Sequence, residues 1–413
     1  MIAAVGLAVR VSYIEVVMPK VVLGVDAIWY RAQAAMIESG VGYVNINELL
    51  AHGRVVPTAH FPPVWPAILA VVSFFGGRSD ATFELAGALA GTATIVLTGL
   101  IGRRVGGGAV GLVAAAVVAL SPGLIAADGS LMSESVFVAL MTLAVLVALR
   151  AAEADKPLWW AGLGVVLALA TLTRSDGLLL APIVIVATVL GRPVMPLRAR
   201  LAAVGIAGAA VIAVVTPWVV SRSAALDAPI LITSNSGTLL EGANCGSTYA
   251  GHDLGLWDVD CVNSTRVPGR PEATTAASGR DAGLEYAREH WDRLPIVGAV
   301  RALRLWGLYD PIDQARSEAV ESRRASWQIL AWAASMLALA FAVAGFVRTW
   351  PRRATFAPLI GVIVGVTVVG ITSWGNQRFR LAAEPSVAVY AAIGLTALVS
   401  RWSAARRPRQ ERR

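Results

Sequence analysis

The sequence predicts an all-α, polytopic membrane protein. Of its 413 residues, 56% are hydrophobic and only 15% are charged, with a mean hydropathy of +0.65. A soluble domain carries about 25% charged residues. Apolar segments of about 20 residues, the length that crosses a bilayer as a helix, recur along the chain. About ten spans are expected, at 1–18, 81–102, 108–127, 131–149, 157–173, 176–191, 199–220, 326–347, 355–373 and 384–400.

Two apolar segments need separate treatment. The run up to Met18 has no small-residue cleavage site before "PKVV", which favours an uncleaved first span. The stretch "PPVWPAILAVVSFFGG" at 62–77 is brief and interrupted by proline. We therefore expect an interfacial or half-inserted juxtamembrane helix there instead of a span.

Basic residues predict the orientation. Arginine and lysine gather in alternate short loops and in the tail "RWSAARRPRQERR" at 401–413. The positive-inside rule then places the N-terminus and this tail in the cytoplasm. Lysine is almost absent while alanine, valine, glycine and arginine are abundant, which is typical of a protein from a high-GC bacterium. The expected location is therefore a bacterial plasma membrane. The net charge of +8 reflects this loop bias, and no nucleic-acid partner is expected.

The same orientation divides the chain into three parts. Residues 1–220 form an N-terminal transmembrane module with a first external loop at 19–80, and residues 326–413 form a C-terminal module with the basic tail. Between spans seven and eight, residues 221–325 hold 14 of the 27 acidic residues, and we expect a small extracytoplasmic soluble domain. Cys245 and Cys261 lie in it; an oxidising exterior favours a disulfide between them, and two free thiols are the alternative.

Several signatures of known chemistry are missing. The sequence has no Walker A loop, no His-Glu-x-x-His, no Cys-x-x-Cys and no nucleophile elbow. Charged residues deep inside the expected spans are sparse, which argues against an ion pump. Arg10 is the exception, and its long side chain could snorkel to the cytoplasmic face.

Polar residues gather instead at the external ends of the spans. They are Asp26 and Tyr30, Asp128 and Glu134, Arg174 and Asp176, and Arg378, Arg380 and Glu384. Carboxylates and arginines at one membrane face suit a reaction between an anionic, lipid-linked substrate and a hydroxyl acceptor. A carboxylate can take the acceptor proton, and arginines can hold a phosphate leaving group. The alternative is that these are ordinary helix-end charges, with Asp176 as a helix cap.

The order of several segments resembles the GT-C superfamily of membrane glycosyltransferases. It is most similar to the branch of bacterial protein O-mannosyltransferases and lipid A aminoarabinose transferases, including an uncharacterised actinobacterial subgroup. The segments are "GVDAIWYRAQAAMIESGVGY", "HFPPVWPAILA", "GRRVGG", "ADGSLMSESVF", "TLTRSDGLLLAP" and "RFRLAAEPSVAVYAAIGL". None is specific alone, but their order spans nearly the whole chain.

The resemblance implies an inverting transfer from a polyprenyl-phosphate sugar on the outer membrane face. The first-loop aspartate of this class acts as the base, here Asp26. A second acidic residue shapes the site, which matches Glu134 and less directly Asp128. The expected donor-phosphate and substrate contacts are Tyr30, His60, Arg174, Arg378 and Arg380. Trp29 and Tyr30 are also expected to anchor the loop at the membrane interface.

The sequence also leads to expectations about metals, partners and alternative functions. Asp26-Ala27-Ile28 replaces the Asp-x-Asp of the metal-dependent oligosaccharyltransferases, so no obligatory metal or other cofactor is expected. The expected partners are membrane lipids, a polyprenyl-phosphate hexose or pentose, and an acceptor glycan, lipid or protein. A transporter or flippase for lipid-linked glycans is one alternative, and it predicts a charged path through the membrane midplane. A non-catalytic family member in envelope assembly is another.

Overall fold

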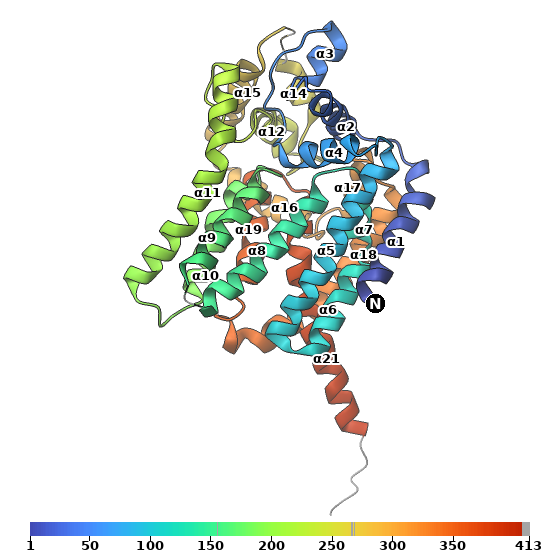
Figure 1. The fold of residues 1–413 in the computed structure, drawn as a ribbon, viewed down its shortest axis with the longest axis vertical. Coiled ribbons are helices and arrows are strands. Elements are labelled where there is room, and N and C mark those ends of the chain that lie inside the picture. Colours follow the sequence, from blue (N-terminus) through green and yellow to red (C-terminus); the bar gives the residue numbers. More distant parts are fainter. Residues whose placement is uncertain (155, 266, 268, 407–413) are drawn as a thin grey trace, which may run out of the picture.

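The computed structural model describes residues 1–154, 156–265, 267 and 269–406. Within these ranges the chain is helical, with one isolated bridge between Val44 and Pro57. Long helices make up the lower body of the molecule, and short helices and loops cover its upper end (Figure 1). The last helix, α21 (Glu384–Arg406), extends from the opposite, lower end. Much of the expected cytoplasmic basic tail, residues 407–413, lies outside the described residues.

Each expected span coincides with a helix or, once, with two. The long helices are α1 (Ile2–Val16), α5 (Asp80–Gly106), α6 (Gly108–Leu120), α7 (Pro122–Gly129), α8 (Glu134–Ala154), α9 (Pro157–Thr171), α10 (Gly177–Leu190), α11 (Leu197–Leu226), α18 (Ala325–Thr349), α19 (Ala357–Thr372) and α21 (Glu384–Arg406). Their buried faces are rich in alanine, valine and leucine, and the largest core cluster joins α8, α9, α10, α19 and α21. The all-helical membrane fold is therefore confirmed.

The count of ten spans is not confirmed. Among the described residues, six helices are long and apolar enough to cross a membrane, or seven if a bent pair counts as one span. The helices α9, α10 and α19 have 15, 14 and 16 residues. At about 1.5 Å per residue these reach about 21 to 24 Å, less than a hydrocarbon core of about 30 Å.

The bent pair, α6 and α7, corresponds to one expected span that the structure divides into two helices. Ser121 has an extended backbone, and Pro122 follows at the first position of α7. Because proline cannot donate a backbone hydrogen bond inside a helix, the chain starts a new helix here, turned by 54°. The helix α7 therefore ends close to the short helices and loops at the upper end of the molecule, which we call the cap. The turn before α8 begins there.

The short helices of the cap come from two parts of the chain. From the first loop come η1 (Met18–Lys20), α2 (Val25–Glu38), α3 (Ile46–His52) and α4 (Val64–Phe74); from the later segment come α12 (Ser236–Ala243), α13 (Gly246–Tyr249), α14 (Val259–Thr265), α15 (Glu272–Glu289), α16 (Leu294–Leu305), α17 (Pro311–Ser317) and η2 (Glu318–Val320). The expected juxtamembrane helix at 62–77 is α4, which lies across the upper ends of the long helices (Figure 1).

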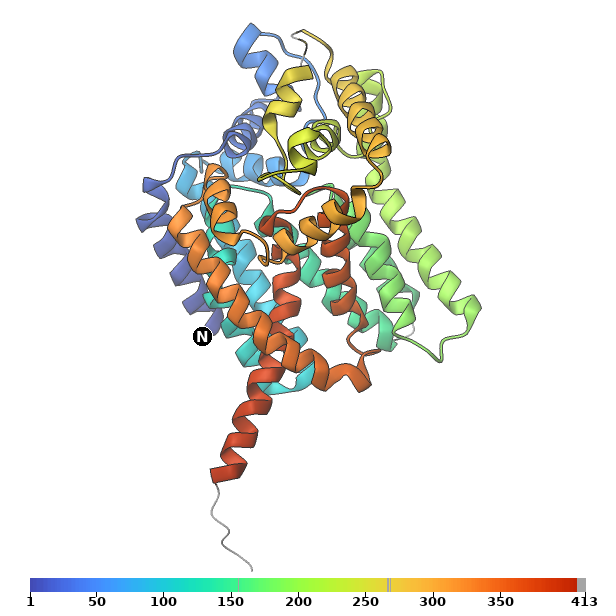
Figure 2. The same cartoon turned by 180° about the vertical axis from the view of Figure 1, so that it is seen from behind.

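The segment 221–325 packs against the spans. From behind, it covers the upper ends of α19 and α21 (Figure 2). Val297 and Leu305 of α16 are buried, and Arg301 Nη1 donates to the carbonyl oxygen of Ile371, 3.2 Å away. The division into three domains stays a prediction, because α16 shares its buried face with the C-terminal helices.

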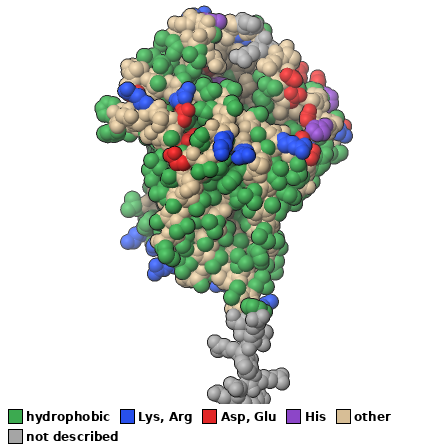
Figure 3. Space-filling view, turned by 90° about the vertical axis from the view of Figure 1, so that its right-hand side faces the viewer, with side chains coloured by type: hydrophobic (Ala, Val, Ile, Leu, Met, Phe, Trp, Pro, Cys, Tyr) green, Lys and Arg blue, Asp and Glu red, His purple; other side chains and the backbone are tan. Residues whose placement is uncertain are grey.

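Charge and hydrophobicity separate on the surface. In the face that Figure 3 draws, hydrophobic side chains cover the lower body, and charged side chains gather in a band near the cap. This distribution suits a protein whose long helices lie in lipid and whose cap lies in water. The side of the membrane on which the cap lies stays a prediction from the loop charges.

Candidate active site

Asp26 lies in the first turn of α2. Gly24 is the N-cap, with an extended backbone, and Asp26 is the acidic residue of the first turn. A carboxylate in this position interacts favourably with the partial positive charge of a helix N-terminus. The start of α2 is held in turn by the segment after η2, because the Gly24 amide donates to Ser322 Oγ at 2.7 Å.

Aromatic packing fixes the rest of α2. Trp29 and Tyr30 are 4% and 3% exposed, and both rings contact Phe61, with centroids 5.0 and 4.9 Å apart. Trp29 also contacts Tyr43 and His60. The prediction that Trp29 and Tyr30 are interfacial anchors is therefore wrong, because both are buried in the protein, where they fix the direction of α2 instead.

Glu134 begins α8 and is buried, with 2% of its side chain exposed. One of its oxygens, Oε1, lies 3.0 Å from Arg174 Nη1 and 2.9 Å from Arg378 Nε. Arg174 comes from the turn between α9 and α10, and Arg378 from the short helix α20 (Gln377–Arg380). A single buried carboxylate thus brings together two guanidinium groups from distant parts of the chain.

Each arginine also has a second carboxylate partner. Arg174 Nε lies 2.9 Å from Asp176 Oδ2, and Arg378 Nη1 lies 2.7 Å from Glu321 Oε2. The charged groups therefore alternate in the order Asp176, Arg174, Glu134, Arg378 and Glu321. The contacts of Arg174 are charge-assisted hydrogen bonds, which are stronger than neutral ones, and the contacts of Arg378 are ion pairs.

A cavity of about 1610 Å³ opens above this network. Its lining includes Asp26, Tyr30, His60, Arg174 and Arg378. Glu134 does not line it and lies behind the two arginines. The cavity therefore presents one carboxylate and two guanidinium groups on the same surface, with the cap segments as its roof.

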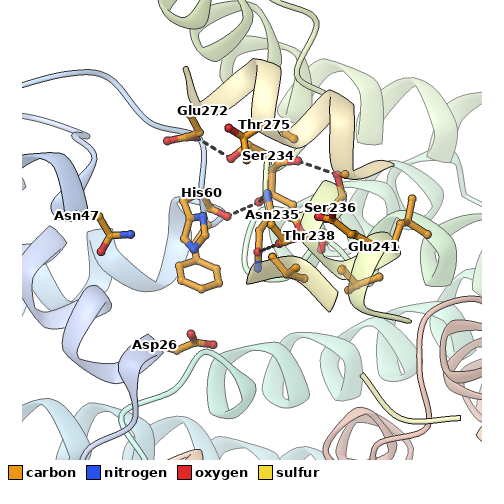
Figure 4. A pocket seen from close by; sticks show the side chains of 18 of the residues that line it. Asp26, Asn47, His60, Ser234, Asn235, Ser236, Thr238, Glu241, Glu272 and Thr275 are labelled. Atoms are coloured by element: carbon orange, nitrogen blue, oxygen red, sulfur yellow. Dashed lines mark hydrogen bonds between the residues drawn. The ribbon is translucent and has the colours of Figure 1, made fainter. Parts of the chain in front are cut away.

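The cavity wall has a polar part and an apolar part. Above Asp26, side chains of α12, α15 and the first loop form a polar roof (Figure 4). Its members include Asn47, Ser234, Asn235, Thr238 and Thr275. The apolar part is formed by Leu178, Leu179, Ala225, Leu226, Val369 and Phe379, from the ends of three long helices and α20. A ligand with a polar head and an apolar tail matches such a cavity.

The environment of Asp26 sets its protonation. Burial and the nearby charge of Glu321 raise the pKa of its carboxyl group, Arg378 opposes both, and the resulting pKa is about 6. Burial disfavours the charged form because water no longer solvates it. A carboxylate with a pKa near the working pH suits a general base.

Two predicted site residues lie elsewhere. Asp128 is buried against Arg10, whose Nε is 2.6 Å from Asp128 Oδ2. Arg380 Nε lies 3.3 Å from Glu384 Oε1, beside a separate cavity of about 90 Å³. The structure does not bring either residue to the large cavity. Arg10 does not snorkel; it is 1% exposed and pairs with Asp128 between α1 and α7.

Residues 60–220 match the family model described as dolichyl-phosphate-mannose-protein mannosyltransferase. A search of the curated proteins found no match.

Solved structures match over the whole fold. The oligosaccharyltransferase AglB of Archaeoglobus fulgidus, in complex with an inhibitory peptide and a dolichol-phosphate, is 13% identical with a TM-score of 0.54; the match covers 100% of this chain and 52% of that one. The same enzyme tethered to an acceptor peptide is 14% identical with a TM-score of 0.56, covering 98% and 50%. The chain has the fold of the GT-C superfamily of membrane glycosyltransferases.

The chain spans about half the length of the archaeal enzyme that it matches. A further match, ArnT of Cupriavidus metallidurans bound to undecaprenyl phosphate, is 15% identical with a TM-score of 0.48, covering 98% of this chain and 79% of that one. The expected resemblance to the GT-C superfamily is confirmed.

Two residues of the candidate site were not predicted from the sequence. Glu321, from "SEAVESRR", reads as a solvated charge, yet it lines the cavity and pairs with Arg378. Glu272, in the first turn of α15, accepts four hydrogen bonds; its donors are Asn45 Nδ2, Thr58 Oγ1, the Ala59 amide and Ser234 Oγ, at 2.6 to 2.8 Å. Neither has a local sequence signal, because their partners are distant in the chain.

Metal-ligand spacing occurs away from the cavity. Among the described residues, two groups have ligand atoms within 4.8 Å of one another: His252 with Asp310 and Asp313, and Asp258 with the two cysteines. Neither group lines the large cavity. The sulfur atoms of Cys245 and Cys261 are joined in a disulfide in the structure, which occupies the second group.

Proposed function

We propose that this protein transfers a hexose or pentose from a polyprenyl-phosphate donor to a hydroxyl group of an acceptor. The transfer takes place on the outer face of the plasma membrane, and it inverts the configuration at the anomeric carbon. The observation that carries the proposal is the shared cavity wall. Asp26, with its pKa raised to about 6, faces the same cavity as two fixed guanidinium groups. A base and a phosphate-binding pair are the two parts that such a transfer requires.

The two-part cavity wall supports a lipid-linked donor. The apolar part, which includes Leu178, Leu179 and Val369, suits the polyprenyl chain near the membrane. The archaeal enzyme of the same fold has been solved with a dolichol-phosphate, a ligand of this chemical class. The polar roof then remains for the sugar and the acceptor.

In the proposed reaction, Asp26 accepts the proton of the acceptor hydroxyl. The hydroxyl oxygen forms a bond to the anomeric carbon from the side opposite the phosphate, and the bond between that carbon and the phosphate oxygen breaks. The electron pair stays on the leaving polyprenyl phosphate, whose charge Arg174 and Arg378 stabilise. Glu134 positions the two arginines in this scheme and does not touch the sugar, since it lies behind them.

The test is a transfer assay on purified, lipid-reconstituted protein. Donors are polyprenyl-phosphate mannose and polyprenyl-phosphate arabinose, and membrane lipid extract supplies acceptors. Asp26→Asn should lower turnover by about a hundredfold or more, the usual effect of removing a general base. Asp80→Asn is the matched control, because Asp80 pairs with Arg31 at an exposed position.

Two results would contradict this proposal. A folded Asp26→Asn variant with wild-type turnover would refute the role of the base. If no donor of this class is turned over by the wild-type protein, and lipid extracts of a deletion strain and its parent are identical, the proposed activity itself is wrong.

A further inference from the structure

Arg378 makes ion pairs with two carboxylates at once. Its Nε lies 2.9 Å from Glu134 Oε1, and its Nη1 lies 2.7 Å from Glu321 Oε2. A phosphate that uses this guanidinium as a two-point partner must meet at least one of these nitrogens. A phosphate that takes the position of either carboxylate therefore exchanges one of these contacts when it binds to Arg378.

The two carboxylates are not equally exchangeable. Glu134 is 2% exposed and is also held by Arg174. Glu321 is 24% exposed, lines the cavity and has Arg378 as its ion-pair partner. Glu321 is consequently the partner that a ligand in the cavity can reach and displace.

We propose that Glu321 competes with the donor phosphate for Arg378. The phosphate of a polyprenyl-phosphate ligand takes the position at Nη1, and the Glu321 side chain turns away into the cavity. This inference rests on the proposed function, because it takes a phosphate-bearing lipid as the ligand. It assigns to Glu321 the role of a positioning residue that sets the affinity for the phosphate group.

The local backbone allows the side chain to move alone. Ser322, which has a left-handed backbone with φ of 59°, accepts the hydrogen bond from Gly24. On the other side, Glu318 Oε2 accepts from Gln328 Nε2 at 2.7 Å. Glu321 therefore sits between two anchored neighbours, and its exchange needs rotation of one side chain and no opening of the segment.

The local charge weakens the hold on Glu321. Four carboxylates, those of Asp26, Glu134, Asp176 and Glu321, face the two guanidinium groups. Glu321 lies close enough to Asp26 for its charge to raise the pKa of that group. Because Asp26 repels it, Glu321 depends on Arg378 for a favourable contact, and an anion that binds Arg378 better replaces it.

The experiment measures binding to the full-length protein in nanodiscs by calorimetry. The ligands are farnesyl phosphate and the neutral alcohol farnesol. Glu321→Gln should bind farnesyl phosphate about tenfold more tightly than wild type, the size of one competing charged contact, with no change for farnesol. Glu48→Gln is the matched control: it is the same substitution on the same cavity, at a carboxylate paired with Arg54.

A double-mutant cycle separates the contact between Glu321 and Arg378 from the general effect of the Glu321 charge on the affinity for phosphate. In the Arg378→Gln background, Glu321→Gln should leave the affinity for farnesyl phosphate unchanged. A tenfold gain that persists there overturns the proposal, and so does a Glu321→Gln protein whose affinity equals that of wild type. If Glu321→Gln lowers the melting temperature, Glu321→Ser, which no longer reaches Arg378, gives the same comparison.

The outcome for wild type distinguishes this inference from the proposed function. If wild type prefers farnesyl phosphate to farnesol but Glu321→Gln gains nothing, only the role of Glu321 is wrong. If wild type and both variants bind the two ligands equally, the phosphate-bearing donor is wrong, and this inference falls with it.

Discussion

The carboxylate of Glu134 and the guanidinium of Arg378 form a buried ion pair, with Oε1 and Nε 2.9 Å apart. The same oxygen also lies 3.0 Å from Arg174 Nη1. One atom at the start of α8 therefore fixes arginines from α20 and from the turn between α9 and α10. Both positive charges on the cavity wall share this one buried oxygen as a partner.

Replacing Glu134 with glutamine should destabilise the protein. The amide keeps the shape but removes the charge that compensates two buried guanidinium groups. Breaking a buried pair in this way costs about 3 kcal/mol. We expect a melting temperature several degrees below wild type, measured by intrinsic fluorescence in detergent. Glu38→Gln is the control, because Glu38 pairs with Arg78, whose side chain is 72% exposed; an equal shift in the two variants would contradict the prediction.

Transfer activity should depend on the protonation of Asp26. Burial favours the neutral acid, so the carboxylate that can accept a proton forms only as the pH rises through about 6. We expect kcat/KM to rise with pH and to reach half of its maximum near this value. Glu321 also raises this pKa, so Glu321→Gln should move the half-point to lower pH. A profile that is flat between pH 5 and 7 (about one unit to either side of that pKa) argues against Asp26 as the base.

Gly24 should tolerate no side chain. A Cβ atom there would lie 2.6 Å from the carbonyl oxygen of Val320, closer than van der Waals contact. Gly24→Ala should push the segment of Ser322 and Glu321 away from Asp26 and lower turnover by about tenfold (about 1.4 kcal/mol). Gly205→Ala is the control, since nothing lies within 4 Å of a Cβ at that helical position. Equal turnover in both variants would show that the close approach does not matter.

Glu272 should hold the first loop onto the later cap segment. It accepts hydrogen bonds from the Ala59 amide and from side chains of Asn45, Thr58 and Ser234. Glu272→Gln exchanges one acceptor oxygen for a donor and should weaken the contact between the first loop and the later cap segment. We expect faster proteolysis within residues 39–60 under native conditions. Glu285→Gln, an exposed position of the same helix, should leave the cleavage rate at the wild-type value.

Much of the fold could be predicted from composition and periodicity. Every expected span coincides with a helix or, at 108–127, with two, because lipid requires each backbone group to be paired within its own helix. The count of ten spans stays unconfirmed for a physical reason: helices such as α9 and α10, with 15 and 14 residues, are shorter than about 30 Å of hydrocarbon. The bend between α6 and α7 can be predicted from the sequence, because Pro122 interrupts the helical hydrogen bonds locally.

The candidate site was only partly predictable. Asp26, Tyr30, His60, Arg174 and Arg378 all reach the cavity. Asp128 and Arg380 had the same residue types at similar span ends, yet they pair with Arg10 and Glu384 away from it. A helix end fixes the depth of a residue, whereas the direction of its side chain depends on which neighbour it packs against.

The sequence by itself determined an all-helical membrane protein with polar helix ends and an aspartate at the start of the first loop, because hydropathy and helix starts are encoded in adjacent residues. Only the tertiary structure decided which charges meet. Glu134 and Glu321 both form ion pairs with Arg378, and Glu272 connects the first loop with the later cap segment. Ion pairs depend on distances between atoms, and distances between remote segments arise only when the helices have packed.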